Sequence, residues 1–342
     1  MKRVAVVILN YNGKKFLETF LPNVIENTDD AMAEIVVADN ASTDGSVEFM
    51  RESFPQIRLI DNGFNGGFAT GYNLALRQIE ADYYVLLNSD IEVTPHWIEP
   101  IVELMDADPQ IAACQPKILS YHDKGKFEYA GASGGFIDRY GYPFCRGRVF
   151  QHLEEDHGQY DDTCEVFWAT GACLFLRADL YLEYGGLDDT FFAHMEEIDF
   201  CWMMKNLGYK VFCCPQSKVY HIGGGTLPKS SSRKTFLNFR NNLSLLYKNL
   251  PSNRVFWVIV YRIMLDWIAA FKFLCGGGLA DFWAVVRAHF AFYGRVPALR
   301  KVRKSTTHHS VSQMYLRNIV FDNFLRGKQL YSDLDPEKFS HA

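Results

Sequence analysis

Short apolar runs alternate with longer amphipathic segments over about the first 220 residues, and this alternation constrains the fold more than any other feature. The apolar runs are rich in Val, Ile, Leu and Tyr, as buried strands are. Alternating strands and helices predict an α/β fold, with a mostly parallel sheet flanked by helices. The expected strands are 4–9, 35–38, 57–60, 83–87, 111–119, 171–177 and 209–214, and the expected helices are 14–27, 46–53, 69–79, 96–105 and 197–207.

Two stretches interrupt this pattern. Residues 120–165 are expected to form a long irregular excursion, and the Gly/Ser-rich stretch 223–232 to form a hinge or mobile loop. The charge also changes there: residues 1–225 carry 17 Lys and Arg against 34 Asp and Glu, whereas residues 226–342 carry 18 against 6. An acidic part followed by a basic part predicts two regions, 1–225 and 226–342, with different partners.

Polar loops follow the first four expected strands. The carboxyl ends of parallel strands share one edge of a sheet, so these loops are expected to lie together, where ligands of such sheets bind. A carboxylate there can bind a base or ribose, a Gly-rich turn admits a phosphate, and an acid after a central strand can hold a divalent metal. A nucleotide site is therefore predicted. The loops are NYNG from Asn10, DNASTD from Asp39, NGFNGGFATGYN from Asn62 and NSD from Asn88.

Two common nucleotide-binding motifs are excluded by the sequence itself. No G-x-G-x-x-G follows the first strand, which argues against a dinucleotide-binding domain, and no G-x-x-x-x-G-K-[ST] occurs, which argues against a P-loop enzyme. The four polar loops at successive strand ends are stronger evidence for a site than one Gly-rich loop alone.

An ordered set of motifs resembles the family 2 glycosyltransferases of the GT-A fold, in particular the rhamnosyltransferase-like branch that builds bacterial surface polysaccharides. The resemblance covers about residues 3–225 and implies a GT-A domain over 1–225. It also implies inverting, metal-dependent transfer of a sugar from a nucleoside diphosphate sugar to an acceptor hydroxyl. The motifs are VVILNYNG, IVVADNASTDGS, NGGFATGYN, LLNSDIEV, TGACLFLR, GGLDDTFFAHMEEIDFCWMMKNLGYKV and YHIGGG.

The resemblance implies roles for individual residues. Asp39 matches the acid that contacts the nucleotide base, with Asn10 and Asn12 beside it. Asp90 matches the last acid of the D-x-D motif that binds Mg²⁺ or Mn²⁺ on the diphosphate, and His221 matches a histidine that completes the metal site in some relatives. This sequence has Asn88 where many relatives have Asp. The further residues expected to contact the donor are Asn40, Gly66, Gly67, Asn73 and Asn88.

A cluster of acids matches the catalytic end of the family pattern. Glu197 matches the catalytic base, in the pair Glu196-Glu197, and Asp199 follows two residues later. The acceptor hydroxyl must lose a proton as it attacks, and a carboxylate in reach can take it. Adjacent residues point in different directions, so only one should reach the acceptor, and Glu197 is favoured over Glu196. The alternative is that all three are ordinary acids of a first helical turn.

The C-terminal region is predicted to contact a membrane. Residues 255–275 are nearly apolar, but Arg262, Asp266 and Lys272 fall within about one third of the helix circumference, which favours an amphipathic helix over a spanning one. A second apolar helix over 279–293 and a basic cluster up to Lys304 follow. Apolar helices with a polybasic segment are typical of a peripheral anchor on the inner face of the plasma membrane. A helical cap or a homodimer face is the alternative.

The expected function is therefore sugar transfer to a lipid-linked or surface-polysaccharide acceptor by a cytoplasmic, membrane-associated bacterial enzyme, without nucleic acid. Eight cysteines without metal-type spacing fit reduced thiols in the cytoplasm. A sugar nucleotidyltransferase and a catalytically inactive glycan-binding module are the alternatives. The first would want a basic Gly-rich loop after the first strand, where NYNG has no basic residue.

Overall fold

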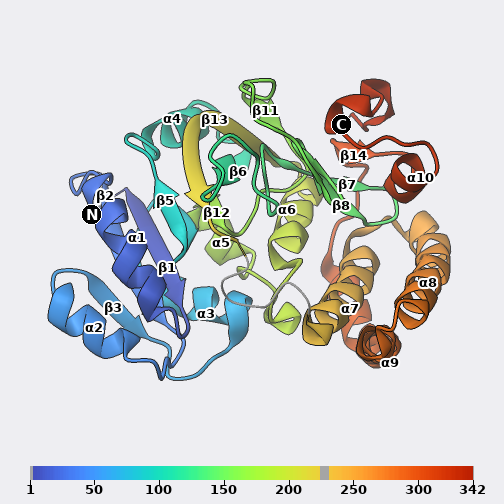
Figure 1. Cartoon of the computed structure of the whole chain (residues 1–342), viewed down its shortest axis with the longest axis horizontal. Coiled ribbons are helices and arrows are strands. Elements are labelled where there is room, and N and C mark those ends of the chain that lie inside the picture. Colours follow the sequence, from blue (N-terminus) through green and yellow to red (C-terminus); the bar gives the residue numbers. More distant parts are fainter. Residues whose placement is uncertain (1–2, 224–230, 342) are drawn as a thin grey trace.

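The computed structural model of the chain describes residues 3–223 and 231–341. Helices flank a central sheet in the order β11-β13-β6-β12-β4-β1-β2-β3, with β5 beside β13 (Figure 1). Pairing is parallel among β3, β2, β1 and β4 and between β13 and β6, whereas β5, β11 and β12 pair antiparallel, so the α/β class is confirmed with a mixed sheet. The strands are β1 (Val4–Asn10), β2 (Ala33–Asp39), β3 (Arg58–Asp61), β4 (Tyr83–Asn88), β5 (Ile91–Val93), β6 (Ile111–Ser120), β11 (Cys164–Glu165), β12 (Cys173–Arg177) and β13 (Lys210–His221).

The helices follow the expected ranges closely in the first half of the chain. One expected boundary is wrong: a helix was expected from His96, but α4 begins at Glu99, because His96 has a left-handed φ of 59° that a helix does not accommodate. The helices are α1 (Lys14–Glu26), α2 (Ser46–Ser53), α3 (Gly67–Leu76), α4 (Glu99–Ala107), α5 (Ala178–Glu183), α6 (Glu196–Asn206), α7 (Ser232–Asn249), α8 (Ser252–Cys275), α9 (Leu279–Ser305) and α10 (Ile319–Phe324).

Alternate residues of β1 enter two different cores. Val4, Val6 and Ile8 pack on the face that α1 covers, and Ala5 and Val7 pack on the face that α3 covers. A strand covered on both faces can be apolar throughout, which explains the run VAVVIL. Polar residues appear only at the end of the strand. Because the parallel strands end at the same edge of the sheet, their polar loops gather there.

The segment 120–165 is not the irregular excursion that the sequence predicts. It contributes β11 to the central sheet and most of a second, smaller sheet in the order β10-β9-β8-β7-β14. These strands are two to four residues long, too short for a periodic pattern to reveal them. The strands of this sheet are β7 (Gly135–Asp138), β8 (Pro143–Cys145), β9 (Arg148–Val149), β10 (His152–Leu153) and β14 (Met314–Tyr315).

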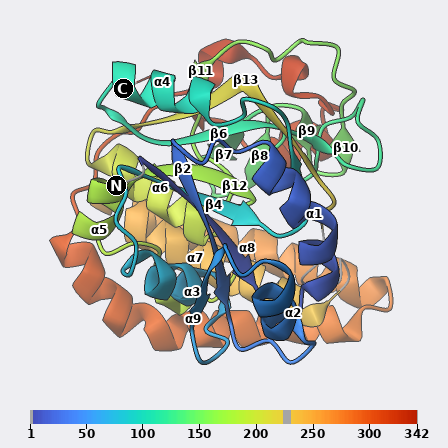
Figure 2. The same ribbon diagram turned by 90° about the vertical axis from the view of Figure 1, so that its left-hand side faces the viewer.

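Helices α8 and α9 form a hairpin along one side of the molecule, and α7 contacts both (Figures 1 and 2). The expected helix over 255–275 is confirmed as α8, while α9 continues to Ser305, well beyond the expected end at residue 293. Within the described residues, no helix is long and apolar enough to cross a bilayer.

The boundary between the two predicted regions is only partly visible. Most of the expected hinge, 223–232, lies outside the described residues. The division of the chain at residue 225 therefore stays a prediction. Residues from the C-terminal region do reach back, since β14 pairs in parallel with β7.

The polar side of α8 faces the protein. Arg262 Nε donates to Asp266 Oδ1 at 2.7 Å, and His289 Nε2 of α9 lies 3.2 Å from Asp266 Oδ2. The Arg262 guanidinium also stacks 3.8 Å over the ring of Tyr142, beyond β7. Three charged residues of α8 were predicted to share one face. Arg262 and Asp266 are buried, at 5% and 1% exposure, whereas the third, Lys272, is exposed.

Arg262→Met is expected to destabilise the fold by about 3–5 kcal/mol, because it leaves Asp266 buried without its cation. Thermal unfolding measures this as a lower midpoint. The double variant Arg262→Met/Asp266→Leu should recover most of the loss, since no uncompensated charge remains. A single variant as stable as the unmodified chain would show that the ion pair does not hold the hairpin.

Candidate functional site

The ends of β1 and β2 bring together an amide and a carboxylate. Asn10 lies opposite Asp39 in the parallel register, and its Nδ2 donates to Asp39 Oδ1 at 2.8 Å. The backbone N–H of Ser42 donates to Asp39 Oδ2 at 2.7 Å. Asn12, just beyond the strand, accepts from the backbone N–H of Thr43 at 2.7 Å. The residues of the first two strand ends that were expected to contact the nucleotide sugar therefore lie next to one another.

The Gly-rich loop before α3 is connected to the end of β2 by hydrogen bonds of Asn40. Asn40 Nδ2 donates to the carbonyl of Gly67 at 3.0 Å, and Asn62 Nδ2 donates to Asn40 Oδ1 at 2.8 Å. Gly66 is the residue that precedes the first turn of α3, and Gly67 has a φ of +79°. A Cβ at Gly67 would stand 2.4 Å from the carbonyl oxygen of Phe192, so glycine is required by contact as well as by conformation.

Asn73 was also expected to contact the nucleotide sugar, and its side chain forms hydrogen bonds within the protein. Its Nδ2 donates to Asp189 Oδ1 and to the carbonyl of Leu187, both at 2.7 Å, and its Oδ1 accepts from Tyr181 Oη at 2.6 Å. These bonds tie α3 to the segment that leads into α6. Its contact with a donor stays a prediction.

A histidine between two carboxylates lies where β4 and β13 end. His221 Nε2 is 3.1 Å from Asp90 Oδ1 and 3.3 Å from Asn88 Nδ2, and His221 Nδ1 is 3.4 Å from Glu128 Oε2. Burial alone would lower the pKa of His221, but the hydrogen bonds and charges of Asp90 and Glu128 outweigh it and raise that pKa to about 10. Burial likewise opposes ionisation of Asp90, but His221 lowers its pKa. Sequence reasoning missed Glu128, which is distant in the chain.

These residues can be tested as metal ligands. Over 3–223 and 231–341, no group of three or more His, Cys, Asp and Glu is arranged as a metal site. However, an oxygen and a nitrogen 3.1 Å apart have the spacing of neighbouring ligands of one octahedral ion with bonds of about 2.1 Å. A carboxylate behind the second ring nitrogen, as Glu128 is, commonly orients a ligating histidine. The pair fits a cation once His221 gives up its proton, with further ligands from the donor.

A strained turn precedes the acids of α6. Phe192, His194 and Met195 have φ values of 69°, 70° and 77°, a left-handed conformation that costs non-glycine residues about 1–3 kcal/mol each. The carbonyl of Phe192 accepts from the backbone N–H of Phe68 at 2.7 Å. The turn is thereby fixed against the Gly-rich loop, and it sets Glu196 and Glu197 at the start of α6.

Both glutamates are held in surroundings that favour the protonated form. Burial raises the pKa of Glu197 to about 7, and burial together with the charge of Glu197 raises the pKa of Glu196. Each keeps a buried carboxylate oxygen, Oε2, without a hydrogen-bond partner among the described residues. Glu196 is buried, whereas Glu197 is partly exposed, so Glu197 is the more accessible of the two.

Helix α7 holds the strained turn through side-chain hydrogen bonds to its backbone carbonyls. Asn241 Nδ2 lies 3.0, 2.9 and 2.8 Å from the carbonyl oxygens of Phe191, Ala193 and His194. Arg240 Nη2 donates to the carbonyl of Phe191 at 2.9 Å. Sequence reasoning missed both residues, because nothing in the sequence places α7 against this turn.

Asp199 faces the same helix, α7. Its Oδ2 lies 2.5 Å from Lys248 Nζ, and its Oδ1 accepts from Asn249 Nδ2 at 2.7 Å. Asp199 is buried and joins α6 to the end of α7. Its expected catalytic role stays a prediction, and its contacts favour an anchoring one.

The sequence is similar to a known protein family and to individual members of it. The model of glycosyl transferase family 2 matches residues 5–183. An N-acetylglucosaminyl-diphospho-decaprenol L-rhamnosyltransferase of Mycobacterium tuberculosis is 24% identical over 231 residues, covering 63% of this chain and 75% of the relative.

Solved structures of low sequence identity share the fold. TarS 1–349 of S. aureus, in complex with UDP-GlcNAc, has a TM-score of 0.56 at 14% identity and covers 88% of this chain and 83% of its own. The mannosyltransferase PcManGT from Pyrobaculum calidifontis, in complex with GDP-Man and Mn²⁺, has a TM-score of 0.52 at 17% identity, with 89% and 79% covered. The expected GT-A fold is confirmed.

The contact between the Gly-rich loop and the turn can be tested with two alanine substitutions. Gly67→Ala is expected to push Phe192 away and to lower kcat at least tenfold, because the turn that carries Glu196 and Glu197 moves. Gly63→Ala is the matched control: its φ is +75° but nothing lies within 4 Å of the added Cβ, so it carries only the backbone cost, about 1 kcal/mol. Equal kcat values for the two variants would mean that the contact does not position the glutamates.

Proposed function

The chain belongs to glycosyl transferase family 2, and on that premise we propose that it transfers a sugar, with inversion, to a hydroxyl of a lipid-linked or polysaccharide acceptor. The observation that carries the proposal is the turn that sets Glu196 and Glu197 against the Gly-rich loop of the nucleotide site. The family favours sugar transfer from a nucleotide sugar over nucleotidyl transfer, as the motifs predicted.

The donor nucleotide is assigned to the polar ends of β1 and β2. We assign the Asp39 carboxylate, which lies beside Asn10, to accept a hydrogen bond from the base or ribose. The Gly66-Gly67 turn at the start of α3 lets the backbone approach the diphosphate, where the N-terminal dipole of the helix favours negative charge. Asn12 and Asn40 hold these two loops in place.

The reaction needs one base and one leaving group. The acceptor oxygen attacks the anomeric carbon, the bond from that carbon to the diphosphate oxygen breaks, and the nucleoside diphosphate leaves. The hydroxyl proton passes to Glu197, whose raised pKa suits a base that works near neutral pH. We assign this role to Glu197 because it is the more exposed of the two glutamates. The charge of Glu197, together with burial, raises the pKa of Glu196 beside it.

Asp90 and His221 are the residues we assign to a divalent cation, Mg²⁺ or Mn²⁺. Asn88 lies within reach of His221 and replaces a second acid with a neutral amide. The cation, when bound, neutralises charge on the leaving diphosphate. Glu128 orients the imidazole from the other side. The Mn²⁺ in the P. calidifontis mannosyltransferase supports this assignment.

Our proposals for the acceptor and for the location of the enzyme are supported by a relative and by the C-terminal region. The M. tuberculosis relative is named for a diphospho-decaprenol acceptor, which supports a lipid-linked acceptor for this chain. We therefore place the enzyme on the inner face of the plasma membrane, held through its basic C-terminal region. A homodimer through the same region is the competing arrangement.

Glu197→Gln is expected to lower kcat by about 10²–10⁴-fold, because glutamine cannot accept the proton. Donor affinity should change little, since the base contacts the acceptor. Release of nucleoside diphosphate from a panel of nucleotide sugars measures turnover. Glu196→Gln is the matched control and should have a milder effect. A dead Glu196→Gln with an active Glu197→Gln would reverse the assignment, and a chain that turns over no donor at all would be an inactive glycan-binding module.

Asp90→Asn is expected to abolish the Mn²⁺-dependent part of nucleoside diphosphate binding, measured by titration with and without the metal. The reason is that Asn88 leaves Asp90 as the only acid of its motif. Glu92→Gln, on the same short segment, is the control, because its carboxylate pairs instead with Lys124 at the surface. Full turnover in the presence of EDTA would contradict the metal assignment.

A further inference from the structure

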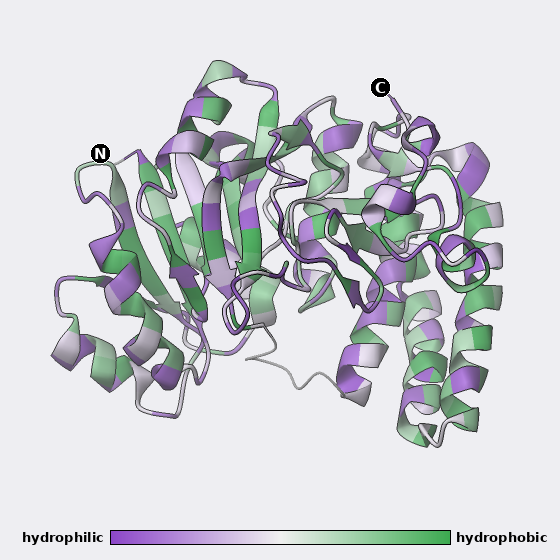
Figure 3. Cartoon of the chain, turned by 45° about the horizontal axis from the view of Figure 1, so that its top comes forward, coloured by the Kyte–Doolittle hydropathy of each residue, from purple (hydrophilic) through white to green (hydrophobic). Residues whose placement is uncertain are grey.

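The hairpin of α8 and α9 is amphipathic, but its polar side faces the protein and its apolar side faces solvent. Its polar side is buried against the protein, since the buried residues of α8 follow a four-residue spacing that includes Arg262 and Asp266. Its apolar side faces outward, and the exposed fraction reaches 70% at Trp257 and 65% at Ile268. Both helices of the hairpin carry many hydrophobic residues along their length (Figure 3). The exposed apolar residues of α8 are Phe256, Trp257, Val260, Met264, Trp267, Ile268, Phe271 and Leu274.

The apolar side continues onto the first half of α9. Leu279, Trp283, Phe290 and Tyr293 are all exposed there. An apolar surface of this kind is typical of contact with a partner or a membrane, because exposing apolar side chains to water is unfavourable in free energy.

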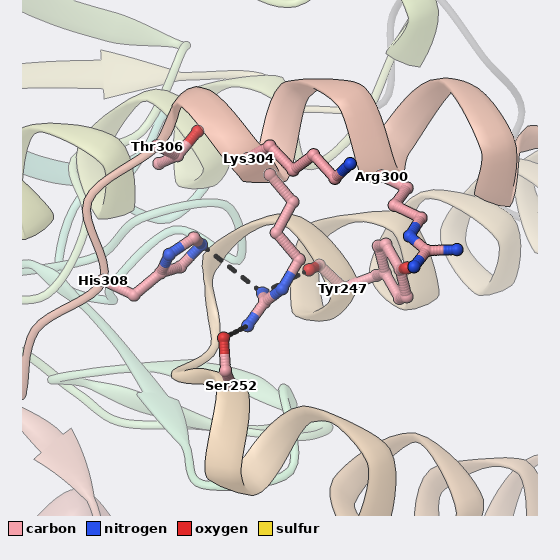
Figure 4. Close-up of a pocket in the computed structure, with 7 residues that line it drawn as sticks. Tyr247, Ser252, Arg300, Lys304, Thr306 and His308 are labelled. Carbon is pink, nitrogen blue, oxygen red and sulfur yellow. Dashed lines mark hydrogen bonds between the residues drawn. The ribbon is translucent and has the colours of Figure 1, made fainter.

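A cationic cavity lies at the open end of the hairpin. We call it the hairpin pocket; its volume is about 420 Å³, and Figure 4 shows its lining from α7, α8, α9 and the segment that follows α9. Arg303 Nη1 donates to the carbonyl of Tyr247 at 2.7 Å, and its Nη2 donates to Ser252 Oγ at 3.1 Å, which ties the end of α9 to the start of α8. The lining residues are Tyr247, Ser252, Arg300, Arg303, Lys304, Thr306 and His308.

Two cations of the hairpin pocket have no partner in the described structure. The side chains of Arg300 and Lys304 are exposed and form no hydrogen bond or ion pair with any described residue. No Asp or Glu lines the pocket. Cationic side chains together with hydroxyl donors, and without an acid, form a site for an anion, and an arginine suits a phosphate in particular.

The hairpin pocket and the apolar side belong to one surface. Tyr293, Arg300 and Lys304 follow one another at spacings of seven and four residues, which keeps them on the same face of α9. An anion bound by Arg300 and Lys304 would therefore stand beside exposed aromatic rings. A phospholipid offers this combination, a phosphate next to an apolar phase.

The charges of the hairpin argue against a second copy of the chain as its partner. Its acids are Asp266, which is buried with Arg262, and Asp281, which accepts from Thr235 Oγ1. Two such surfaces would bring unpaired cations together without acids to meet them, and like charges across an interface are unfavourable.

We propose that the hairpin pocket binds the phosphate of an anionic phospholipid while the exposed apolar side of α8 and α9 rests in the bilayer interface. The proposal rests on the membrane location given above and adds the site and the lipid chemistry that produce it. In Figure 1 the hairpin lies at the right of the molecule, on the far side of α7 from the central sheet.

The test compares two pairs of substitutions with the same loss of charge. Arg300→Gln/Lys304→Gln removes the unpartnered cations of the pocket, and Arg287→Gln/Lys301→Gln removes two exposed cations of α9 that do not line it. Binding to vesicles of phosphatidylcholine with phosphatidylglycerol is measured by flotation at about 0.15 M salt, where long-range attraction is screened. We expect the first pair to weaken binding about 30-fold, and the second about 3-fold.

The outcomes separate the possible ligands. Equal losses for the two pairs would mean diffuse charge attraction and would overturn the pocket. Failure of the unmodified chain to bind these vesicles, with inorganic phosphate raising its thermal stability, would identify a soluble anion and overturn the lipid. Dimerisation through the hairpin, measured by light scattering, would overturn it as well. The assay contains no sugar donor, so its result does not depend on turnover, and an enzyme without turnover could still bind vesicles.

The apolar side is tested separately. Ile268→Gln should weaken vesicle binding at high salt, because the apolar contribution is not screened. Leu182→Gln is the control, since Leu182 is similarly apolar and 49% exposed but lies on α5. Equal binding by the two variants would show that α8 does not enter the interface.

Discussion

The left-handed turn before α6 is the constraint on which the candidate active site depends. Phe192, His194 and Met195 each occupy a backbone region that bulky residues avoid, and such strain persists only where surrounding contacts over-determine it. Here the Gly-rich loop bonds to the turn from one side, and Asn241 bonds to three of its carbonyls from the other. The turn therefore couples the Gly-rich loop to the two glutamates, so that in the proposed reaction the groups assigned to the donor and to the acceptor share one support.

The sequence alone predicted that polar loops gather at one edge of the sheet, for a physical reason. Strands buried on both faces are apolar throughout, so polar residues concentrate at their ends, and parallel register brings those ends together. Asn10 and Asp39 are register partners and hydrogen-bond as a result. The pairing of Asp90 with His221 rested on the family resemblance alone, because the strand expected over 209–214 continues to His221 only in the structure, as β13.

What the sequence could not predict depends on contacts between distant segments. Glu128 reaches His221, and Asn241 reaches the strained turn, across many intervening residues that carry no local pattern for either contact. The same holds for the contacts of Asp199 with Lys248 and Asn249, which no pattern in the sequence predicts. The amphipathic character of α8 was visible in the sequence, but which side faces water was not, because burying Arg262 requires the ring of Tyr142 and the carboxylate of Asp266.

The central claim is that Glu197, held by the strained turn, takes the proton of the acceptor. Its pKa is raised to about 7 by burial, and only the ionised form can act as a base. The most direct measurement is kcat as a function of pH at saturating donor and acceptor. The account predicts that kcat rises as the pH increases through about 7 and then levels off, and that this rise disappears in Glu197→Gln. A kcat that falls across neutral pH, or a rise that survives the substitution, would contradict it.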